Sequence, residues 1–264
     1  MNNGFIYVAS VSKLFYRMAA HSAESLRDFY PDANITLFTH EKFLDNKQKL
    51  FNNVVTNIPI HTRAKMWGMA RSPYDRTLYI DSDTEIWSDE IKNVHSVLDE
   101  CDLFFSHTPI YSAGNIKWIY VDKEHSKRLE LQGGVCGFKK SELTIDFLQT
   151  WYDDYCKQHA FPWPYHQYNP ELKPWDMFTL WKLTNEPYYK EKYKSLVIKK
   201  ESVKYNYCIN YLPSELKPGE SPVIIQYIKD QIKNHPNLNK QINYENEKTY
   251  FTKQEVNQYP PRYN

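Results

Sequence analysis

The stretch Arg76-Thr77-Leu78-Tyr79-Ile80-Asp81-Ser82-Asp83-Thr84-Glu85-Ile86 places a short, mostly apolar run directly before two aspartates. Residues 77–80 suit a strand that is buried on both faces, and such strands are typical of parallel sheets. Open parallel sheets bind ligands beyond the carboxyl ends of their strands, where Asp81 and Asp83 are expected to lie. Two neighbouring carboxylates repel each other unless a cation lies between them, and ligation by oxygen alone favours Mg²⁺ or Mn²⁺. The stretch therefore predicts a metal site that carries a phosphate group.

The acid-x-acid pair alone is a weak signal, and its surroundings decide what it means. The chain has 32 acidic residues among 264, so chance alone gives about four such pairs. Upstream, the sequence predicts strands at 5–9, 35–38 and within 54–60, and helices at 13–30 and 63–71. Strands that alternate with helices are typical of a parallel sheet with right-handed crossovers. The two aspartates would then follow the fourth strand of an α/β fold.

Downstream of the pair, the pattern continues and includes two unusual segments. Residues 131–138 hold three of the seven glycines, so the backbone there is expected to approach a ligand or another strand closely. Residues 159–175 are rich in aromatic residues and proline, and no helix or regular strand is expected in them. The other predicted elements are helical segments at 88–100, 141–157 and 176–183 and strands at 102–105, 196–200 and 223–228.

Length and composition indicate one α/β domain with embellishments. With 33 basic and 32 acidic residues the formal net charge is +1, so no overall field favours nucleic acid or an anionic membrane. The first residues carry no secretion signal, and no segment has the ~20 apolar residues that a membrane span needs. We therefore expect a cytoplasmic protein, from a bacterium or a virus-infected host cell, without a nucleic-acid partner or an integral membrane segment. Four widely spaced cysteines are expected to be reduced and mostly buried: Cys101, Cys136, Cys156 and Cys208.

Several segments of the chain match a known family in their order and spacing. They are the strand and helix over residues 5–30, Arg63-Ala64-Lys65 with Ser72-Pro73-Tyr74-Asp75, Asp81-Ser82-Asp83, Gln132-Gly133-Gly134-Val135, and Trp175-Asp176. Over residues 4–230 the chain resembles nucleotide-sugar-dependent glycosyltransferases of the GT-A fold, most closely glycogenin-like (family 8-like) and related bacterial or viral transferases. The resemblance implies a central, mostly parallel sheet flanked by helices, with one GT-A domain over residues 1–230. Residues 231–264 would form a polar C-terminal extension that packs on this domain or trails from it.

By this resemblance, Asp81 and Asp83 hold Mn²⁺ or Mg²⁺ against the diphosphate of a nucleotide sugar, with Asp81 also near the ribose and Ser82 beside the donor. The alternative is a pair that caps a helix from a loop. Lys65 would reach the donor phosphates from the preceding helix, where a positive charge stabilises the departing diphosphate. Arg63 would contact the donor from the same segment. The alternative for Lys65 is a solvated helix face.

Ala9, Ser10 and Phe15 match the part of the family that cradles the base and the ribose of the donor. There an aromatic ring can stack on uracil, so the expected donor is a UDP-sugar. The alternative for Phe15 is a core position, since an apolar ring one turn into a helix is commonly buried.

Two of the matching segments depart from the family pattern. Gln132 stands where the family usually has asparagine, before Gly133 and Gly134, which would meet the donor sugar. The alternative for the two glycines is a β-bulge. Asp176 matches an aspartate that faces the donor sugar and is expected to be catalytic with Lys65, although Met177 replaces the glutamine that usually follows. The alternative for Asp176 is a helix-start position favoured by the macrodipole.

Gln226 stands where many relatives have a histidine as the third metal ligand. Its carbonyl oxygen can ligate a hard cation, but it is a weaker donor than imidazole. We therefore expect a loosely held ion that needs the nucleotide to complete its ligand shell.

Trp163, Tyr165 and Trp175 are the candidate acceptor-binding residues, because flat aromatic rings stack on the apolar faces of sugars. The alternative is a lid of aromatic residues and prolines that packs on the core.

The resemblance implies a metal-dependent, hexosyltransferase-like enzyme that moves a sugar from a nucleotide-diphosphate sugar to a hydroxyl group. The acceptor would be a glycan, a lipid-linked molecule or a protein. Retention of the anomeric configuration is expected from the resemblance, since no general base is identified at the position that inverting relatives use. One alternative is a catalytically silent module that binds glycans or nucleotide sugars. A haloacid-dehalogenase-type phosphatase is less favoured, because that family carries its motif on the first strand and has threonine or valine where Glu85 stands.

Overall fold

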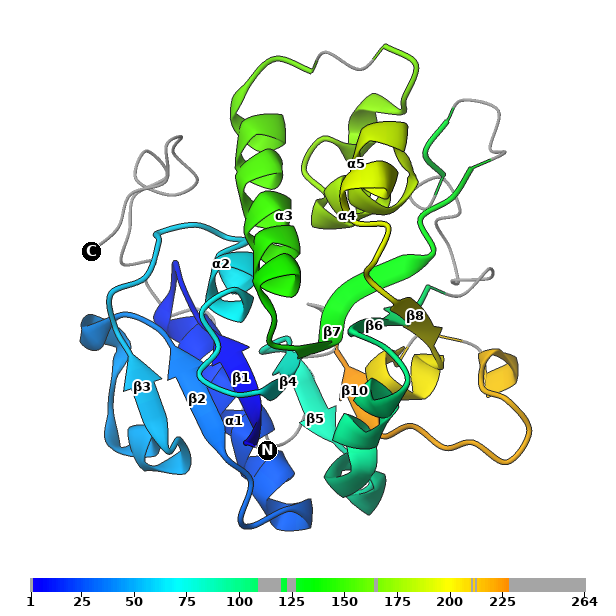
Figure 1. The fold of residues 1–264 in the computed structure, drawn as a ribbon. Coiled ribbons are helices and arrows are strands. Elements are labelled where there is room, and N and C mark those ends of the chain that lie inside the picture. The colour runs from blue at the N-terminus through cyan, green and yellow to red at the C-terminus, as the bar shows by residue number, and fades with distance from the viewer. Residues whose placement is uncertain are drawn as a thin grey trace.

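The computed structural model describes residues 2–108, 120–122, 127–163, 166–209, 211 and 213–227 (Figure 1). The predicted C-terminal extension, residues 231–264, and the acceptor candidate Tyr165 lie outside the described residues. Within these ranges, no helix is both long enough and apolar enough to cross a membrane.

A seven-stranded sheet in the order β3-β2-β1-β4-β7-β6-β8 forms the centre of the fold. Neighbours among β1 to β4 pair in parallel, as do β6 and β8, whereas β7 runs antiparallel to both β4 and β6. The mostly parallel sheet predicted from the sequence is therefore confirmed, with one reversed strand at its middle. The strands are β1 (Asn3–Val8), β2 (Ile35–Phe38), β3 (Asn53–Val55), β4 (Arg76–Ile80), β6 (Leu103–His107), β7 (Leu131–Lys139) and β8 (Ile198–Glu201).

A second, three-stranded sheet in the order β5-β10-β9 lies beyond the end of β4. It consists of β5 (Thr84–Ile86), β9 (Tyr207–Cys208) and β10 (Ile224–Gln226). Because β5 begins directly after Asp83 and Gln226 pairs with Thr84, this sheet brings the late part of the chain to the two aspartates.

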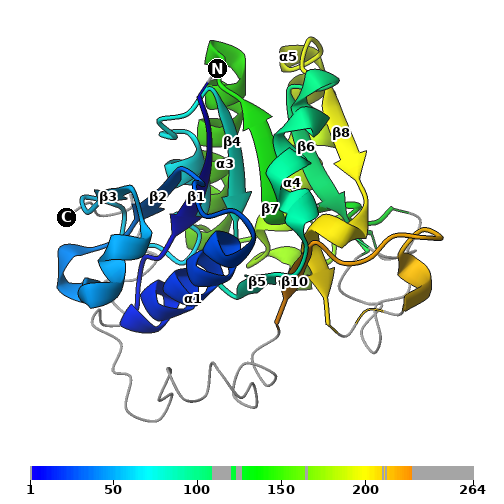
Figure 2. The ribbon, with the colours of Figure 1, turned by 90° about the horizontal axis from the view of Figure 1, so that it is seen from below.

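Helices cover both faces of the central sheet (Figures 1 and 2). One face carries α1 (Lys13–Phe29) and the 3₁₀ segment Asp89–Asp99, and the opposite face carries α2 (Lys65–Met69) and α3 (Glu142–Ala160). The later helices are α4 (Asp176–Asn185) and α5 (Pro187–Lys192). Ser12 caps the start of α1, because its hydroxyl accepts a hydrogen bond from the backbone N–H of Leu14 at 3.0 Å.

The side chains of β4 alternate between two hydrophobic clusters, one on each face of the sheet. Leu78 and Ile80 pack with α1, and Tyr79 packs with α2 and α3. The predicted strand with two buried faces is therefore confirmed. This alternation also directs the Asp81 side chain to the α2 face, because Asp81 lies two residues after Tyr79.

Several predicted elements differ from the structure. The third strand ends at Val55, and residues 58–60 are not in a strand, which agrees with the missing backbone N–H of Pro59. The predicted helix 63–71 is only the short α2, and residues 88–100 form a 3₁₀ segment. In the segment 159–175, for which no helix was predicted, α3 extends to Ala160, and the described residues include the 3₁₀ turn Pro170–Leu172, because proline is tolerated in a first helical turn.

The four cysteines are buried and unpaired, as predicted.

Candidate active site

Asp81 and Asp83 line a cleft of ≈ 360 Å³ at the carboxyl ends of β1 and β4. The backbone N–H of Asp81 donates to the carbonyl of Gly134 at 2.8 Å, so the pairing of β4 with β7 continues to the first aspartate. The hydroxyl of Tyr79 donates a short hydrogen bond to the Asp81 carboxylate. The predicted position of the pair at the end of the fourth strand is confirmed.

Asp83 is held by the second sheet. The side-chain amide of Gln226 donates to the Asp83 carboxylate at 3.2 Å, and the backbone N–H of Tyr227 donates to the Asp83 carbonyl at 2.8 Å. Burial and the charge of Asp81 raise the pKa of Asp83 to about 7. A cation between the two carboxylates would remove this conflict between like charges.

Gln226 lies beside the acidic pair, as the predicted metal-ligand role requires. Its NH₂ group faces Asp83, and the Cys208 thiol donates to its carbonyl oxygen at 3.5 Å. Ligation through that oxygen would need the amide group to turn over. Among the described residues, no cluster of three or more histidine, cysteine or acidic side chains could hold a metal ion. Among the described residues, amide oxygens are candidates for further ligands.

Asn206 supplies an amide of this kind, and the sequence did not indicate it. The residue is fully buried, and neither amide atom has a hydrogen-bond partner in the part of the chain that the structure describes. A methyl group added at Gly134 would lie 2.5 Å from Asn206 Nδ2 and 3.2 Å from Asp81 Oδ2. The amide therefore lies close to the acidic pair. A buried amide without a partner is costly, and its oxygen is a suitable ligand for Mg²⁺ or Mn²⁺, so the residues present fit a bound divalent ion.

Lys65 connects Asp81, at the end of β4, with Asp176, at the start of α4. Its buried ammonium group donates to the Gly133 carbonyl at 2.8 Å and lies 3.0 Å from Asp176 Oδ2 and 3.5 Å from Asp81 Oδ1. Burial alone would lower the pKa of Lys65, but the charges of Asp176 and Asp81 raise it, so the side chain stays protonated. The alternative of a solvated helix face is wrong for Lys65.

Asp176 is the first residue of α4 and also part of this ion network. Arg63 Nε lies 3.2 Å from its Oδ1, on the side away from Lys65. Burial alone would raise the pKa of Asp176, but the positive charges of Lys65 and Arg63 outweigh it and lower the pKa to about 2. The helix-start position is therefore confirmed, whereas the catalytic role stays a prediction: Asp176 is buried behind Lys65 and Arg63, which line the cleft, and does not line it itself.

Gly133 and Gly134 allow side chains on both faces of β7 to approach its backbone. A methyl group at Gly133 would lie 3.0 Å from the Trp151 ring and 3.2 Å from Asp176 Oδ2. The register between β6 and β7 also shifts here, between Phe105 and Ser106, so the predicted irregularity is present as well. Of the described glycines, Gly219 alone has a positive φ, so the backbone conformation of β7 does not require glycine. The close approach of neighbouring side chains to the backbone is therefore the reason for glycine at these two positions.

Gln132 lies beside the two glycines and is only partly satisfied. Its amide N–H donates to the Tyr211 hydroxyl at 3.1 Å, and its buried carbonyl oxygen has no hydrogen-bond partner among the described residues.

Of the three predicted base-binding residues, Ser10 and Phe15 line the cleft and Ala9 does not. Phe15 lines it with 39 % of its surface exposed, so the alternative of a core position is wrong. Ser10 also lines the cleft, but its hydroxyl already donates to the Pro59 carbonyl at 2.7 Å. Ala9 is buried, and Ser82 lies at the cleft wall. The sequence did not indicate four further lining residues, namely His61, Tyr155, His159 and Pro174.

The aromatic acceptor candidates pack on a small separate cluster. Trp163 and Trp175 both contact the group formed by Val121, Leu129, Leu172 and Phe178. The ring centre of Trp163 lies 5.3 Å from that of Phe178. This packing agrees with the lid alternative, and acceptor binding stays a prediction for these residues.

Comparison with known proteins links this architecture to one group of enzymes. No family model matches the chain, and no curated protein matches its sequence. The glycosyltransferase GlyE of Streptococcus pneumoniae TIGR4 has a similar structure, with 15 % identity, a TM-score of 0.55 and 86 % of this chain aligned to 55 % of GlyE. This chain therefore spans about half the length of GlyE.

Two further glycosyltransferases share the architecture. Mouse xyloside xylosyltransferase 1 aligns with 11 % identity, a TM-score of 0.51 and coverage of 86 % of this chain and 97 % of that enzyme. The bifunctional glycosyltransferase WbbM aligns with 12 % identity and a TM-score of 0.51, over 85 % of this chain and 45 % of WbbM. The mixed sheet, its flanking helices and these similarities show that the chain has the GT-A fold of glycosyltransferases.

Proposed function

We propose that the protein is a metal-dependent glycosyltransferase that moves a sugar from a nucleotide-diphosphate sugar, specifically a UDP-sugar, to a hydroxyl group of an acceptor. The main support is the ion network in which Lys65 contacts both Asp81 and the buried Asp176, because Lys65, Asp81 and Asp83 line the cleft and the unsatisfied Asn206 lies near Asp81. A volume of ≈ 360 Å³ is within the range of small-molecule sites.

The donor would bind along this cleft with its base near Phe15 and its diphosphate near the two aspartates. Asp81 and Asp83 would hold Mn²⁺ or Mg²⁺, together with the amide oxygens of Asn206 and of Gln226, the predicted third ligand. The bound ion would neutralise charge on the diphosphate. The fixed, protonated Lys65 would stabilise the charge that builds on the departing nucleoside diphosphate.

Asp176 would orient the donor sugar rather than transfer a proton. With a pKa of about 2 its carboxylate stays ionised at neutral pH, so it accepts hydrogen bonds from sugar hydroxyls and favours positive charge at the anomeric carbon. We include retention of configuration in the proposal on the resemblance alone. Proton NMR of the first-formed product would test it.

The test is release of nucleoside diphosphate from a panel of nucleotide sugars, with Mn²⁺ and without it. We expect slow Mn²⁺-dependent release from at least one donor. Asp83→Asn should abolish this release. The control Asp32→Asn neutralises an exposed carboxylate distant in sequence from Asp83 and should not affect it. Binding of a nucleotide sugar in a thermal-shift assay without any release would instead identify the silent binding module.

The phosphatase alternative does not agree with the fold. That family needs the motif after its first strand, whereas Asp81 follows β4 of a sheet that contains the antiparallel β7.

A further inference from the structure

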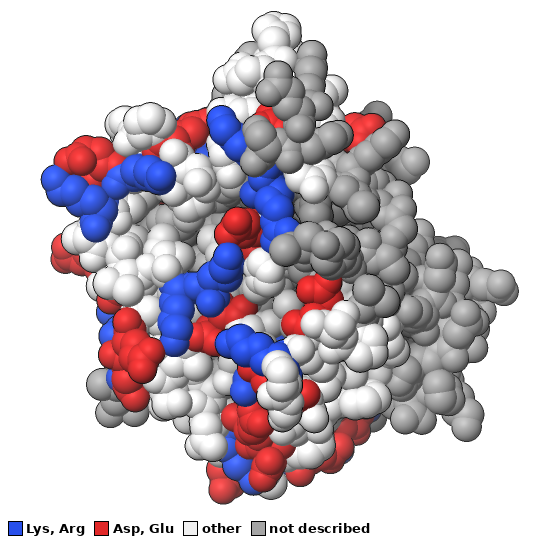
Figure 3. Space-filling view, turned by 90° about the vertical axis from the view of Figure 1, so that its right-hand side faces the viewer, with Lys and Arg blue, Asp and Glu red and all other residues white. Residues whose placement is uncertain are grey.

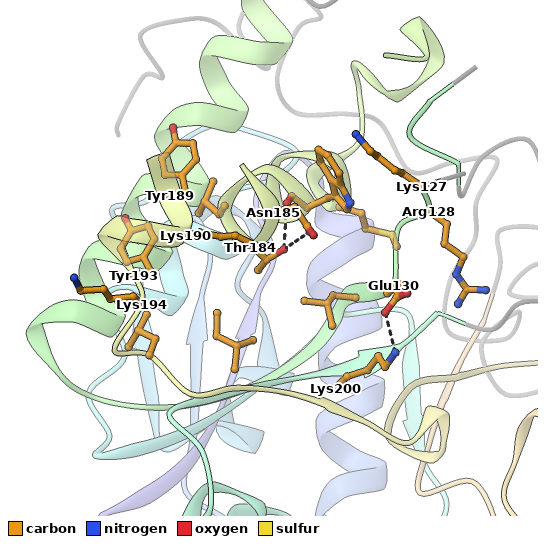
Figure 4. A pocket seen from close by; sticks show the side chains of 16 residues that line it. Lys127, Arg128, Glu130, Thr184, Asn185, Tyr189, Lys190, Tyr193, Lys194 and Lys200 are labelled. Carbon is orange, nitrogen blue, oxygen red and sulfur yellow. Dashed lines mark hydrogen bonds and ion pairs between the residues drawn. The ribbon is translucent and has the colours of Figure 1, made fainter. Parts of the chain in front are cut away.

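A second hollow of ≈ 730 Å³ lies between the α4–α5 pair and the β7–β8 part of the sheet (Figure 4). Its walls are formed by residues of α4 and α5 on one side and by Leu131, Ile198 and Lys200 on the other. β8 forms the edge of the sheet on this side of the molecule, and Figure 3 shows that basic side chains gather near the centre of that side.

The charge of this hollow departs from that of the chain. Five basic residues line it, Lys127, Arg128, Lys190, Lys194 and Lys200, together with a single acidic residue, Glu130. The whole chain carries a net charge of only +1. Glu191, just outside the lining, pairs with Lys194, and the local excess stays positive even when this carboxylate is counted. Charges of one sign in a concave site focus the field and attract an anion.

Some of these cations can engage a ligand. Lys190 has no side-chain partner among the described residues, and it lines the hollow together with Lys200. Lys200 pairs with Glu130 at 2.8 Å, but both side chains are about half exposed, so this pair is weak. Arg128 donates to the Thr108 carbonyl at 3.0 Å, and its buried Nε has no hydrogen-bond partner in the described ranges.

The remaining wall suits a sugar. The aromatic side chains of Trp181, Tyr189 and Tyr193 line the hollow beside the polar groups of Thr184 and Asn185. Aromatic rings stack on the apolar faces of sugar rings, and polar side chains hydrogen-bond their hydroxyls.

The hollow also borders the candidate active site. Leu131 and Met177 line it, and they are the sequence neighbours of Gln132 and Asp176. The first turn of α4 therefore contacts the lining of the cleft through Asp176, which pairs with Lys65 and Arg63, and lines the hollow through Met177.

We propose that this hollow binds the acceptor, and that the acceptor is an anionic saccharide, a sugar that carries a phosphate or a carboxylate. This inference rests on the proposed glycosyl transfer. The anionic group is bound by Lys190, Lys200 and Arg128, and the sugar rings lie on the aromatic wall.

The experiment measures saccharide binding to the full chain without divalent metal, by calorimetry and by tryptophan fluorescence. The probes are glucose 6-phosphate, trigalacturonate and neutral maltotriose. We expect one or both anionic probes to bind, more weakly at high salt, and maltotriose to bind at least about tenfold more weakly. The fluorescence change should be lost in Trp181→Phe, which keeps an aromatic ring next to Phe178.

A pair of double variants tests the site. Lys190→Gln with Lys200→Gln should weaken anionic binding by about tenfold or more. Lys49→Gln with Lys92→Gln removes the same charge from exposed positions outside the hollow and should leave binding unchanged. Thermal unfolding of each variant shows whether it is folded, and Lys190→Glu alone serves as the replacement if the first double variant is not.

Equal binding of maltotriose and the anionic probes overturns the inference, and so does equal binding by both double variants. Tighter binding of a single-stranded oligonucleotide than of either anionic saccharide also overturns it. Release of nucleoside diphosphate by the wild-type protein is measured in parallel. If release occurs and anionic saccharides do not bind, the inference fails while the proposed function stands. If release does not occur, the proposed function fails.

Discussion

Replacement of Lys65 by methionine tests the ion network that links the two parts of the site. The change keeps the length of the side chain but removes the ammonium group that contacts Gly133, Asp176 and Asp81. Removal of one partner of a buried ion pair costs about 3–5 kcal/mol, because the other charge stays buried without compensation. Arg63 still contacts Asp176 at 3.2 Å, so we expect the lower end of this range.

The pKa of Asp176 gives an independent magnitude. Its net fall from 3.8 to about 2 corresponds to about 2 kcal/mol, which remains after the charges of Lys65 and Arg63 have outweighed the cost of burial. Because the folded pKa lies below the unfolded value, this stabilisation is present above about pH 4 and is lost as the pH falls to about 2. Lys65→Met should therefore weaken the acid dependence of stability as well as stability at neutral pH.

The assay is urea unfolding at neutral pH and at about pH 3, followed by circular dichroism. Lys47→Met is the matched control, because Lys47 forms a partly exposed pair with Glu24, and it should cost less than about 1 kcal/mol. The double variant Lys65→Met with Asp176→Asn should be more stable than the sum of the single changes predicts. The buried network would be refuted if the free energy of unfolding of Lys65→Met lay within about 1 kcal/mol of the wild-type value, which is roughly the loss expected for the control.

Three further predictions concern the cleft and the core. Phe15→Ala should change stability by no more than about 0.5 kcal/mol but weaken UDP binding about fivefold, because the exposed ring is available for stacking; unchanged affinity by calorimetry would contradict this. Gly134→Ala should destabilise by about 1–3 kcal/mol and reduce donor turnover, because its methyl group would lie 2.5 Å from Asn206; wild-type stability and turnover would count against it. Burial lowers the pKa of His95 to about 4, so the free energy of unfolding should fall as the pH drops from about 6.5 towards 4, by about 2 kcal/mol at pH 5. In urea titrations, His95→Gln should remove most of this dependence of the unfolding free energy on pH. An equal dependence in the variant would show that another group causes it.

The position of the acidic pair could be predicted because local and global signals agree. The run from Thr77 to Ile80 alternates between two hydrophobic clusters, and only a strand between two layers of helices does this. The capped start of α1 was predictable for the same reason, since Ser12 precedes a long helical pattern.

The contacts within the site could not be predicted from the pattern. Lys65 and Asp176 are distant in sequence, and neither short segment indicates that they form an ion pair in the fold. Asn206 ends a 3₁₀ turn, Val203–Asn206, that has no periodicity, so only its burial in the folded chain identifies it. The strands β5 and β9 were missed because they are too short to show alternation.

A calorimetric titration of Mn²⁺ into the protein tests the central claim most directly, that Asp81 and Asp83 hold a divalent ion against a nucleoside diphosphate. With UDP present we expect Mn²⁺ to bind to the wild-type protein but not to Asp83→Asn, and without UDP we expect only weak binding. Equal Mn²⁺ binding by Asp83→Asn in the presence of UDP, or no Mn²⁺ binding by the wild-type protein, would contradict the claim.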